Sequence, residues 1–172
     1  MCETVDYLKT HYQENPLFKY FNQQEFDYFL SLTETVEYEA NQIIFHKGQE
    51  ARGFFLILKG KIRVQREKEA EKPKVLADIE APTVLGEMGL MAKRVRTSTA
   101  LCLEPSTVLF FNKQKYLELL EKNDLMAFKL SHNVGTIVGE KMEAMNVAMM
   151  DMRAKFKEFT QFKASLFSDW NF

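Results

Sequence analysis

The sequence lacks the features of disulfide-rich, membrane-spanning and secreted proteins. It contains two cysteines, Cys2 and Cys102, which are too few for a disulfide framework. No apolar run approaches the ~20 residues needed to cross a bilayer. The first residues carry acids where a secretory signal needs bases. These absences predict a soluble, cytoplasmic protein that does not use a membrane.

An excess of one charge sign is also lacking. The chain has 23 Lys and Arg residues against 24 Asp and Glu residues, a formal net charge of −1. Proteins that bind nucleic acid or anionic lipid mostly carry a basic excess, because phosphates dominate those surfaces. We therefore expect no nucleic acid partner. With 46% hydrophobic residues in a chain of 172, the composition is that of a globular domain with its own core.

The residue clusters of an enzyme are missing as well. The three histidines, His11, His46 and His132, are scattered over separate regions. A cupin, which is a metal-dependent β-roll enzyme, needs clustered histidine and carboxylate ligands, so the scattered histidines argue against a cupin. No Ser/His/Asp set and no paired catalytic carboxylates stand out. We predict no catalytic residues, no metal and no cofactor.

What the sequence does contain is a strand-rich middle between two helical ends. Five of the seven glycines lie in the middle third, where short alternating or β-branched runs are bounded by Gly, Pro, Asn or charge clusters. Strands this short, at spacings near ten residues, predict a β-sandwich or roll. We interpret the mixed-charge stretch Arg66–Lys74 as a solvated hairpin tip. The predicted strands are Gln42–His46, Phe54–Leu58, Lys61–Gln65, Val75–Ile79, Ser98–Leu103 and Thr107–Phe111.

Capping signals mark the N-terminal helices. Asn15 precedes Pro16 at a first helical position. Asn22 and Glu25 have the spacing of a capping box.

Two helices are expected at the C-terminal end. Lys113–Glu121 shows helical spacing, and Asp124 can cap a proline-free helix that runs toward Phe159. We divide the chain into N-terminal helices at 1–33, a β-roll with its following helix at 34–123, and a long helix with an aromatic tail at 124–172.

One segment carries a possible anion site. Gly86 and Glu87 end a strand, a short helical turn over 88–94 follows, and Arg96 then enters the next strand. The forked donors of an arginine suit phosphate oxygens, as do free N–H groups at the start of a helical turn. Glu87 can accept hydrogen bonds from sugar hydroxyls, or pair with Arg96 when the pocket is empty. An acid for a ribose beside a base for a phosphate favours a small cyclic phosphodiester.

This segment resembles the phosphate-binding cassette, here 85–98, of the cyclic nucleotide-binding domain family. That family includes bacterial catabolite activator-like proteins, kinase regulatory subunits and nucleotide-gated channels. The spacing from Gly86-Glu87 to Arg96 fits without a gap, and Thr97-Ser98 supply the small pair that follows the arginine. The resemblance covers roughly residues 15–135. It implies a mainly β fold, a double-stranded β-helix or jelly-roll β-roll, with N-terminal helices and a long C-terminal helix.

The resemblance also implies roles for matching residues. Glu87 would accept from the ribose 2′-hydroxyl, and Arg96 would neutralise the cyclic phosphate. The implied ligand-binding residues are Gly86, Glu87, Met88, Gly89, Arg96, Thr97 and Ser98. A threonine after the arginine is often associated with guanine contact in the kinase and channel branches, so cAMP and cGMP both remain open. In the dimeric activators a Thr-Ser pair on the C-terminal helix contacts adenine. Here Lys141 and Met142 stand at that position and are possible base contacts that depart from the pattern.

A second feature is an apolar stripe on the predicted long helix. Its residues alternate at spacings of three and four, which is a heptad seam over more than three heptads. We predict a homodimer through this seam. The alternatives are a face that lies on the roll of its own chain, or a methionine-rich surface that docks another protein. The stripe comprises Gly135, Val138, Met142, Met145, Met149, Met152, Phe156 and Phe159.

The end of the chain suggests a sensor without an effector domain. The aromatic tail Phe159–Phe172 is expected to fold back over the roll or the ligand base. Only 13 residues follow Phe159, and the long helix carries as many acids as bases, so we expect no DNA-binding helix-turn-helix. The predicted function is a cyclic nucleotide sensor that acts through its C-terminal helix on a second copy or on an unknown downstream protein. The alternative is a scaffolding or dimerisation module with a degenerate or unused pocket.

Overall fold

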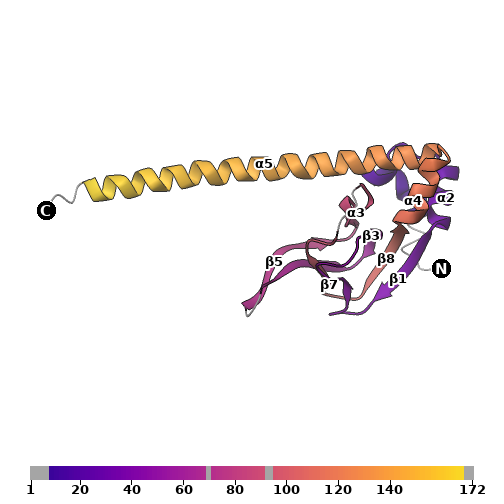
Figure 1. The fold of residues 1–172 in the computed structure, drawn as a ribbon, viewed down its shortest axis with the longest axis horizontal. Helices are drawn as coiled ribbons and strands as arrows, with labels where there is room; N and C mark the ends of the chain where they lie inside the picture. Colours follow the sequence, from indigo (N-terminus) through magenta and orange to yellow (C-terminus); the bar gives the residue numbers. More distant parts are fainter. Residues whose placement is uncertain (1–7, 69–70, 92–94, 169–172) are drawn as a thin grey trace. The chain divides into compact units, whose positions relative to one another are not determined.

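The computed structural model describes residues 8–68, 71–91 and 95–168, with the side chains of 67–72 and 162–168 left aside. The chain forms two units, Met1–Val134 and Gly135–Phe172, and each is described by itself. The elements in order are η1 (Tyr12–Glu14), η2 (Pro16–Phe18), α2 (Gln23–Ser31), β1 (Thr33–Tyr38), β2 (Ile43–Phe45), β3 (Gly53–Lys59), β4 (Lys61–Lys68), β5 (Glu71–Glu80), β6 (Thr83–Leu85), α3 (Met88–Met91), β7 (Thr99–Cys102), β8 (Ser106–Asn112), α4 (Lys113–Glu121) and α5 (Leu125–Ser168), as labelled in part in Figure 1.

The strands of the first unit form a roll of two antiparallel sheets. In the part of the chain that the structure describes, one sheet has the order β1-β8-β3-β6 and the other has the order β2-β7-β4-β5. Neighbours in each sheet are mostly distant in sequence, as in a jelly roll. The predicted fold, a β-roll with N-terminal helices and a long C-terminal helix, is confirmed (Figure 1).

All six predicted strands are present, but the prediction missed β1 and β6. Strand β1 has the polar sequence Thr-Glu-Thr-Val-Glu-Tyr and pairs along its length with β8, from Thr33 opposite Phe111 to Tyr38 opposite Ser106. It lies at the edge of its sheet and exposes Glu34. Charged residues on edge strands discourage pairing with other chains, which explains why this strand lacks an apolar signature.

The mixed-charge stretch is strand for most of its length, so the prediction of a tip over Arg66–Lys74 was wrong in extent. Strand β4 continues to Lys68 and β5 begins at Glu71, with these two residues in register. Ladder hydrogen bonds come from the backbone, so charged side chains do not prevent a strand when both faces can be solvated. The residues between them lie outside the described part.

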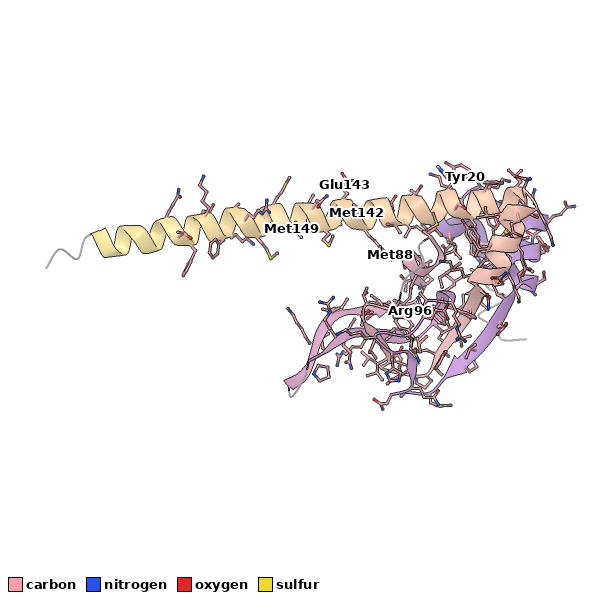
Figure 2. All side chains as sticks on the ribbon, viewed as in Figure 1. Tyr20, Met88, Arg96, Met142, Glu143 and Met149 are labelled. Atoms are coloured by element: carbon pink, nitrogen blue, oxygen red, sulfur yellow. The ribbon has the colours of Figure 1, made fainter. Side chains whose placement is uncertain are left out.

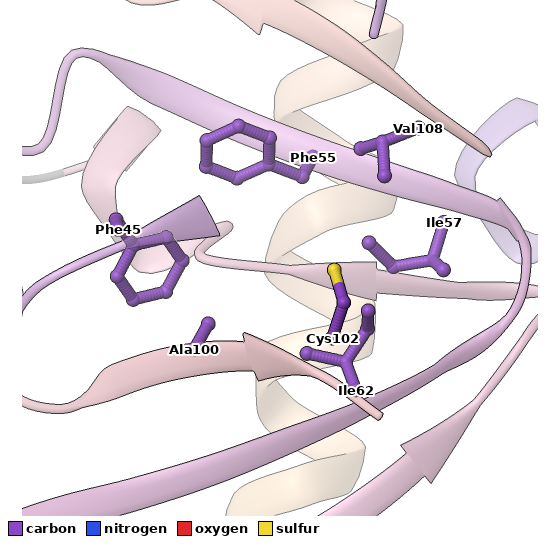
Figure 3. Close-up of a cluster of buried hydrophobic side chains, with 7 residues drawn as sticks. All are labelled: Phe45, Phe55, Ile57, Ile62, Ala100, Cys102 and Val108. Atoms are coloured by element: carbon purple, nitrogen blue, oxygen red, sulfur yellow. The ribbon is translucent and has the colours of Figure 1, made fainter. Parts of the chain in front are cut away.

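The core of the roll lies between the two sheets. It is a cluster of buried side chains from β2, β3, β4, β7 and β8, drawn in Figure 3. Burial raises the pKa of the Cys102 thiol, whose side chain is fully buried within this cluster. The cluster comprises Phe45, Phe55, Ile57, Ile62, Ala100, Cys102 and Val108.

The N-terminal helices cover the outer face of the β3–β8 sheet with aromatic side chains. The ring of Phe29 lies 5.0 Å from those of both Phe18 and Phe111. Both predicted caps are confirmed. Asn15 accepts from the backbone N–H of Leu17, and a reciprocal capping box joins Asn22 and Glu25. The first cap begins a 3-10 turn rather than an α-helix.

Helix α5 begins where the sequence predicted but ends later. The carboxylate of Asp124 accepts from the N–H of Met126 at 2.9 Å. The helix then continues to Ser168. The prediction that the chain folds back after Phe159 was therefore wrong for residues 159–168, and residues 169–172 lie outside the described part. The expectation that the aromatic tail covers the ligand base depends on side chains from residue 162 onward, which lie outside the described part. Among the described helices, none combines the length and the apolarity needed to cross a membrane.

The first turns of α5 belong to the roll unit and are fixed to its helices. Asn133 is buried and donates to the carbonyl of Leu17 at 2.9 Å. Lys129 forms hydrogen bonds of 2.6 and 2.7 Å with the two carboxylate oxygens of Glu25. Because these contacts join residues more than a hundred positions apart, they tie the two ends of the roll unit together.

Candidate functional site

The seven residues that the sequence singled out as a cassette line one cavity of about 190 Å³. The cavity lies where β6 ends, α3 passes and β7 begins. Phe45 from β2 and Ala51 from the segment before β3 complete the lining, together with Leu85 and Val95. The structure thus brings together the residues Gly86, Glu87, Met88, Gly89, Arg96, Thr97 and Ser98.

Two glycines allow the cassette to pack against its arginine. Gly86 has a φ of +76°, a region that L side chains rarely adopt. A Cβ built on Gly86 would collide with Nη1 of Arg96, and one built on Gly89 would lie 2.7 Å from the Cβ of Ala51. Both positions therefore require glycine if α3 is to keep this close approach.

Arg96 is the most unusual side chain of the site. It is 7% exposed, and its guanidinium carbon lies 4.4 Å from the ring centroid of Phe45 and 5.3 Å from that of Phe55. Nη2 donates to the carbonyl of Gly53 at 2.8 Å and Nη1 to that of Gly86 at 3.2 Å. Within the described residues its buried Nε–H has no acceptor. Burial lowers the pKa of this guanidinium, and the charge of Glu87 opposes that shift.

Glu87 faces the same cavity without forming the predicted hydrogen-bonded pair with Arg96. It is 7% exposed and lines the cavity, but the hydrogen bonds of Arg96 go to backbone carbonyls. The negative charge of the carboxylate raises the pKa of Arg96 and so opposes the effect of burial. A carboxylate and a cationic N–H donor that lacks an acceptor can together bind a ligand that carries both hydroxyl groups and an anionic group.

A short backbone segment connects the cassette to α4. Gly53 accepts from Arg96, and the preceding Arg52 carbonyl accepts from the N–H of Lys113 at 2.7 Å. The ammonium of Lys113 donates to the carbonyl of Gly89 at 3.0 Å. The segment Ala51–Gly53, the linking segment, therefore contacts α3, Arg96 and the start of α4 at once.

Sequence reasoning missed the surroundings of Arg96. Phe45 and Phe55 read as ordinary strand residues, Gly53 as a residue that bounds a strand and Lys113 as the start of a helix, and none of them indicated the ligand site. Only the fold brings these distant positions to the cassette. The predicted base contacts, Lys141 and Met142, belong to the second unit and stay predictions. In the described part of the chain, no group of three or more His, Cys, Asp or Glu residues could hold a metal ion.

The fold and the cavity define a β-roll with an anion-competent pocket between a glycine-rich turn and an arginine. The family model of the cyclic nucleotide-binding domain matches residues 35–123, just over half of the chain. The chain belongs to this family.

Individual relatives agree with that assignment. The "Cyclic AMP receptor protein" of Thermus thermophilus is 26% identical over 128 residues, which cover 74% of this chain and 57% of that protein. The crystal structure of the Thermus thermophilus catabolite activator protein has a TM-score of 0.68 at 23% identity, covering 78% of this chain and 62% of that one. This chain thus spans about three fifths of the length of both relatives.

An enzyme is also similar to part of this chain. Lysophospholipase NTE1 of Chaetomium globosum is 21% identical over 112 residues, which are 65% of this chain but 7% of the enzyme. The shared part is a small fraction of that protein. Proteins similar to this chain therefore include both a receptor protein and an enzyme, and what they share with this chain is the binding domain.

Proposed function

We propose that this protein is a cyclic nucleotide sensor whose ligand binds in the cassette cavity. The observation that carries the proposal is the buried guanidinium of Arg96, which lines the cavity with Glu87 and keeps an Nε–H donor without an acceptor among the described residues. A cyclic phosphate supplies the charge and the acceptor that this group lacks. Glu87 then accepts from the ribose 2′-hydroxyl. The remaining contacts to the phosphate come from Gly86, Met88, Gly89, Thr97 and Ser98.

Both cAMP and cGMP are candidate ligands. The name of the Thermus relative favours cAMP. Thr97 lines the cavity directly after Arg96, and the kinase and channel branches of the family associate a threonine there with guanine. Lys141 and Met142 are the proposed base contacts. Direct comparison of the two nucleotides decides which base is preferred.

The test is calorimetric titration of nucleotide-free protein with each ligand. Arg96→Lys keeps the charge and loses the fork, so affinity should fall by about 100-fold, the equivalent of roughly 3 kcal/mol for charge-assisted hydrogen bonds. Arg52→Lys is the matched control, because it makes the same change at a side chain that is 78% exposed and lies outside the cassette cavity. Its binding should equal that of the wild type.

A contrary result has a clear meaning. If folded, nucleotide-free protein releases no heat with either ligand, or if Arg96→Lys binds as well as wild type, the sensor proposal is wrong. The scaffolding alternative, with an unused pocket, would then describe the protein.

We further propose that the output passes through a homodimer of α5. Val138 is half-buried, but the seam side chains from Met142 to Phe159 are exposed, from 42% for Met149 to 72% for Phe156 (Met142 and Met149 in Figure 2). As far as its residues are described, to Ser168, that unit is a single helix, so no other element of the described part covers this face from within the unit. A second copy would cover it, using Val138, Met142, Met145, Met149, Met152 and Phe156.

The residues beside the seam support a parallel pair. In a parallel coiled coil, Lys141 would face Asn146 of the second copy and Lys155 would face Thr160. Arg153 would face an alanine, so no like charges would oppose each other. The acids of this region lie off the seam, as Glu143 does in Figure 2. A homodimer of this register is therefore free of electrostatic penalty.

Ligand binding acts as a switch if it favours one arrangement of α5 over another. The linking segment offers a path, because Lys113 joins the cassette helix to the start of α4. A dimer dissociation constant that changes with nucleotide supports a sensor, and one that ignores nucleotide supports the scaffold. We propose a cytoplasmic regulator without catalytic activity that acts on a downstream protein rather than on nucleic acid.

A further inference from the structure

The β4–β5 hairpin matches opposite charges at its base. Lys61 lies in register with Glu80, and Arg63 with Asp78. Each pair is closed by an ion contact of 2.7 Å. Opposite charges that face each other across two strands stabilise a sheet, whereas like charges destabilise it. The base of the hairpin follows this rule at both cationic positions.

The same ladder breaks the rule further along, where Arg66 lies in register with Lys74. Both side chains are exposed. In the part of the chain that the structure describes, the side chain of Arg66 forms no hydrogen bond or ion pair, in contrast to that of Arg63 three residues earlier. The like-charge pair of Arg66 and Lys74 destabilises the sheet, whereas an acid at position 74 would stabilise it. A destabilising arrangement of this kind is often found where a ligand supplies the missing charge.

Arg66 lies beside the cassette. It lines a second cavity of about 340 Å³, the basic annex, whose lining shares Val95, Arg96 and Thr97 with the cassette cavity. Lys47 also lines the basic annex, and it too has no hydrogen-bonding side-chain partner among the described residues. Among the described residues, the lining of the basic annex therefore holds three cations and no acid.

We propose that the basic annex is a second anion subsite, and that the ligand of the cassette carries a second anionic group that binds between Lys47 and Arg66. This inference rests on the proposed function, because Arg96 belongs to both cavities. A cyclic mononucleotide has one phosphate, which the cassette neutralises, and it leaves the annex unused. Glu87 in the cassette disfavours the contiguous charge of a linear polyphosphate. The ligand class that fits is a cyclic dinucleotide, in which sugars separate two ring phosphates.

The experiment compares cyclic di-AMP and cyclic di-GMP with cAMP and cGMP by calorimetry on the full, nucleotide-free chain. At least one dinucleotide should bind about 10-fold more tightly than its mononucleotide, since each charge-assisted contact contributes this much or more. Arg66→Gln should remove that advantage and leave mononucleotide affinity within about 2-fold. Lys61→Gln is the matched control, because it makes the same change in charge on the same strand at the base of the hairpin.

A second variant separates folding from binding. Lys74→Glu gives Arg66 an in-register acid, as Asp78 gives Arg63. The thermal midpoint should be unchanged or higher, while the affinity for the dinucleotide falls about 10-fold. A stable protein with weakened binding cannot be explained by loss of fold.

Several results would overturn the inference. Mononucleotide binding that needs Arg96, without any gain for dinucleotides, refutes the annex and leaves the proposed function intact. Equal losses in Arg66→Gln and Lys61→Gln show general electrostatics rather than a site. Arg66-dependent binding of random-sequence duplex DNA, without a dinucleotide preference, assigns the cations to nucleic acid. If no nucleotide shows Arg96-dependent binding, the proposed function itself fails.

Discussion

The two units of the chain use similar apolar residues in opposite ways. In the roll unit, Phe29, Phe54 and Phe111 are fully buried against one another. In the second unit, Met145 and Phe156 belong to a regularly spaced apolar stripe but are 58% and 72% exposed. The comparison teaches that a regular spacing tells which side chains share a face. It does not tell what covers that face.

The difference has an energetic side. The roll unit owes its stability to its own packing, and its aromatic cluster buries large side chains completely. An isolated helix gains little from its own hydrogen bonds, and most helix stability in proteins comes from packing of the apolar face. The second unit should therefore depend on a partner, whereas the roll should not.

The largest expected effect tests the roll side of this comparison. Phe29→Ala removes a fully buried ring that touches Phe18 and Phe111, and it should lower the free energy of unfolding by about 3–5 kcal/mol. Phe156→Ala makes the same change in the second unit and should leave the unfolding of the roll nearly unchanged. Urea unfolding followed by near-UV circular dichroism measures both. Equal losses in the two variants would show that the units are not distinct in this respect.

The next effect tests the seam. Met149→Lys places a charge in the proposed dimer interface and should weaken the dimer by about 100-fold, or roughly 3 kcal/mol. Met150→Lys is the control, because Met150 is adjacent, 70% exposed and off the seam. Sedimentation velocity over a range of concentrations gives both dissociation constants. A wild-type chain that stays monomeric, or two variants that behave alike, would contradict the seam.

The smallest effect concerns the start of α5, which the roll unit holds. Glu25 is 14% exposed and bonded to Lys129, whereas the pair of Glu34 with Lys115 is longer, at 3.9 Å, and exposed. Glu25→Gln should lower the free energy of unfolding by about 1–2 kcal/mol at neutral pH. Glu34→Gln should cost little, because exposed pairs contribute little.

The pH dependence of this effect follows from the pKa of Glu25. Burial raises that pKa, but the hydrogen bonds from Lys129 and from the Asn22 N–H, with the charge of Lys129, lower it below its ordinary value of 4.5 overall. Since the folded state then holds the proton less tightly than the unfolded state, the carboxylate's contribution is complete above pH 4.5. It is lost as the pH falls through the lowered value. The gap between wild type and Glu25→Gln should narrow in acid, and a gap that widens there would contradict this assignment.

The sequence predicted the elements whose signals are local. The capping box at Asn22, the start of α5 at Asp124 and the boundaries of Lys113–Glu121 depend on neighbouring residues and are confirmed. The polar edge strand β1 was missed because its pairing partner, β8, lies some seventy residues away in the sequence. Its side chains mostly face solvent, so they do not show the apolar pattern of a core strand. The end of α5 was misplaced because aromatic residues near Phe159 resemble a segment that packs back.

The site was predictable in its residues and not in its surroundings. One contiguous motif, from Gly86 to Ser98, supplied every predicted member of the cavity lining. The aromatic platform under Arg96 comes from β2 and β3, and the like-charge pair of Arg66 and Lys74 exists only through strand register. Neither can be read from spacing along the chain, because sheet register decides which side chains meet.

The linking segment Ala51–Gly53 bears on how this sequence can diverge. Arg52 contributes its carbonyl to Lys113, while its side chain is exposed, so almost any residue could serve there. Gly53 and Gly89 allow no such freedom, since a Cβ at either would strike backbone or side-chain atoms. Over evolutionary time, the side chain at position 52 should therefore vary freely, while glycine stays fixed at positions 53 and 89. Its tolerance would be mistaken for unimportance by anyone who ranks residues by invariance, although its backbone joins the cassette to the helices.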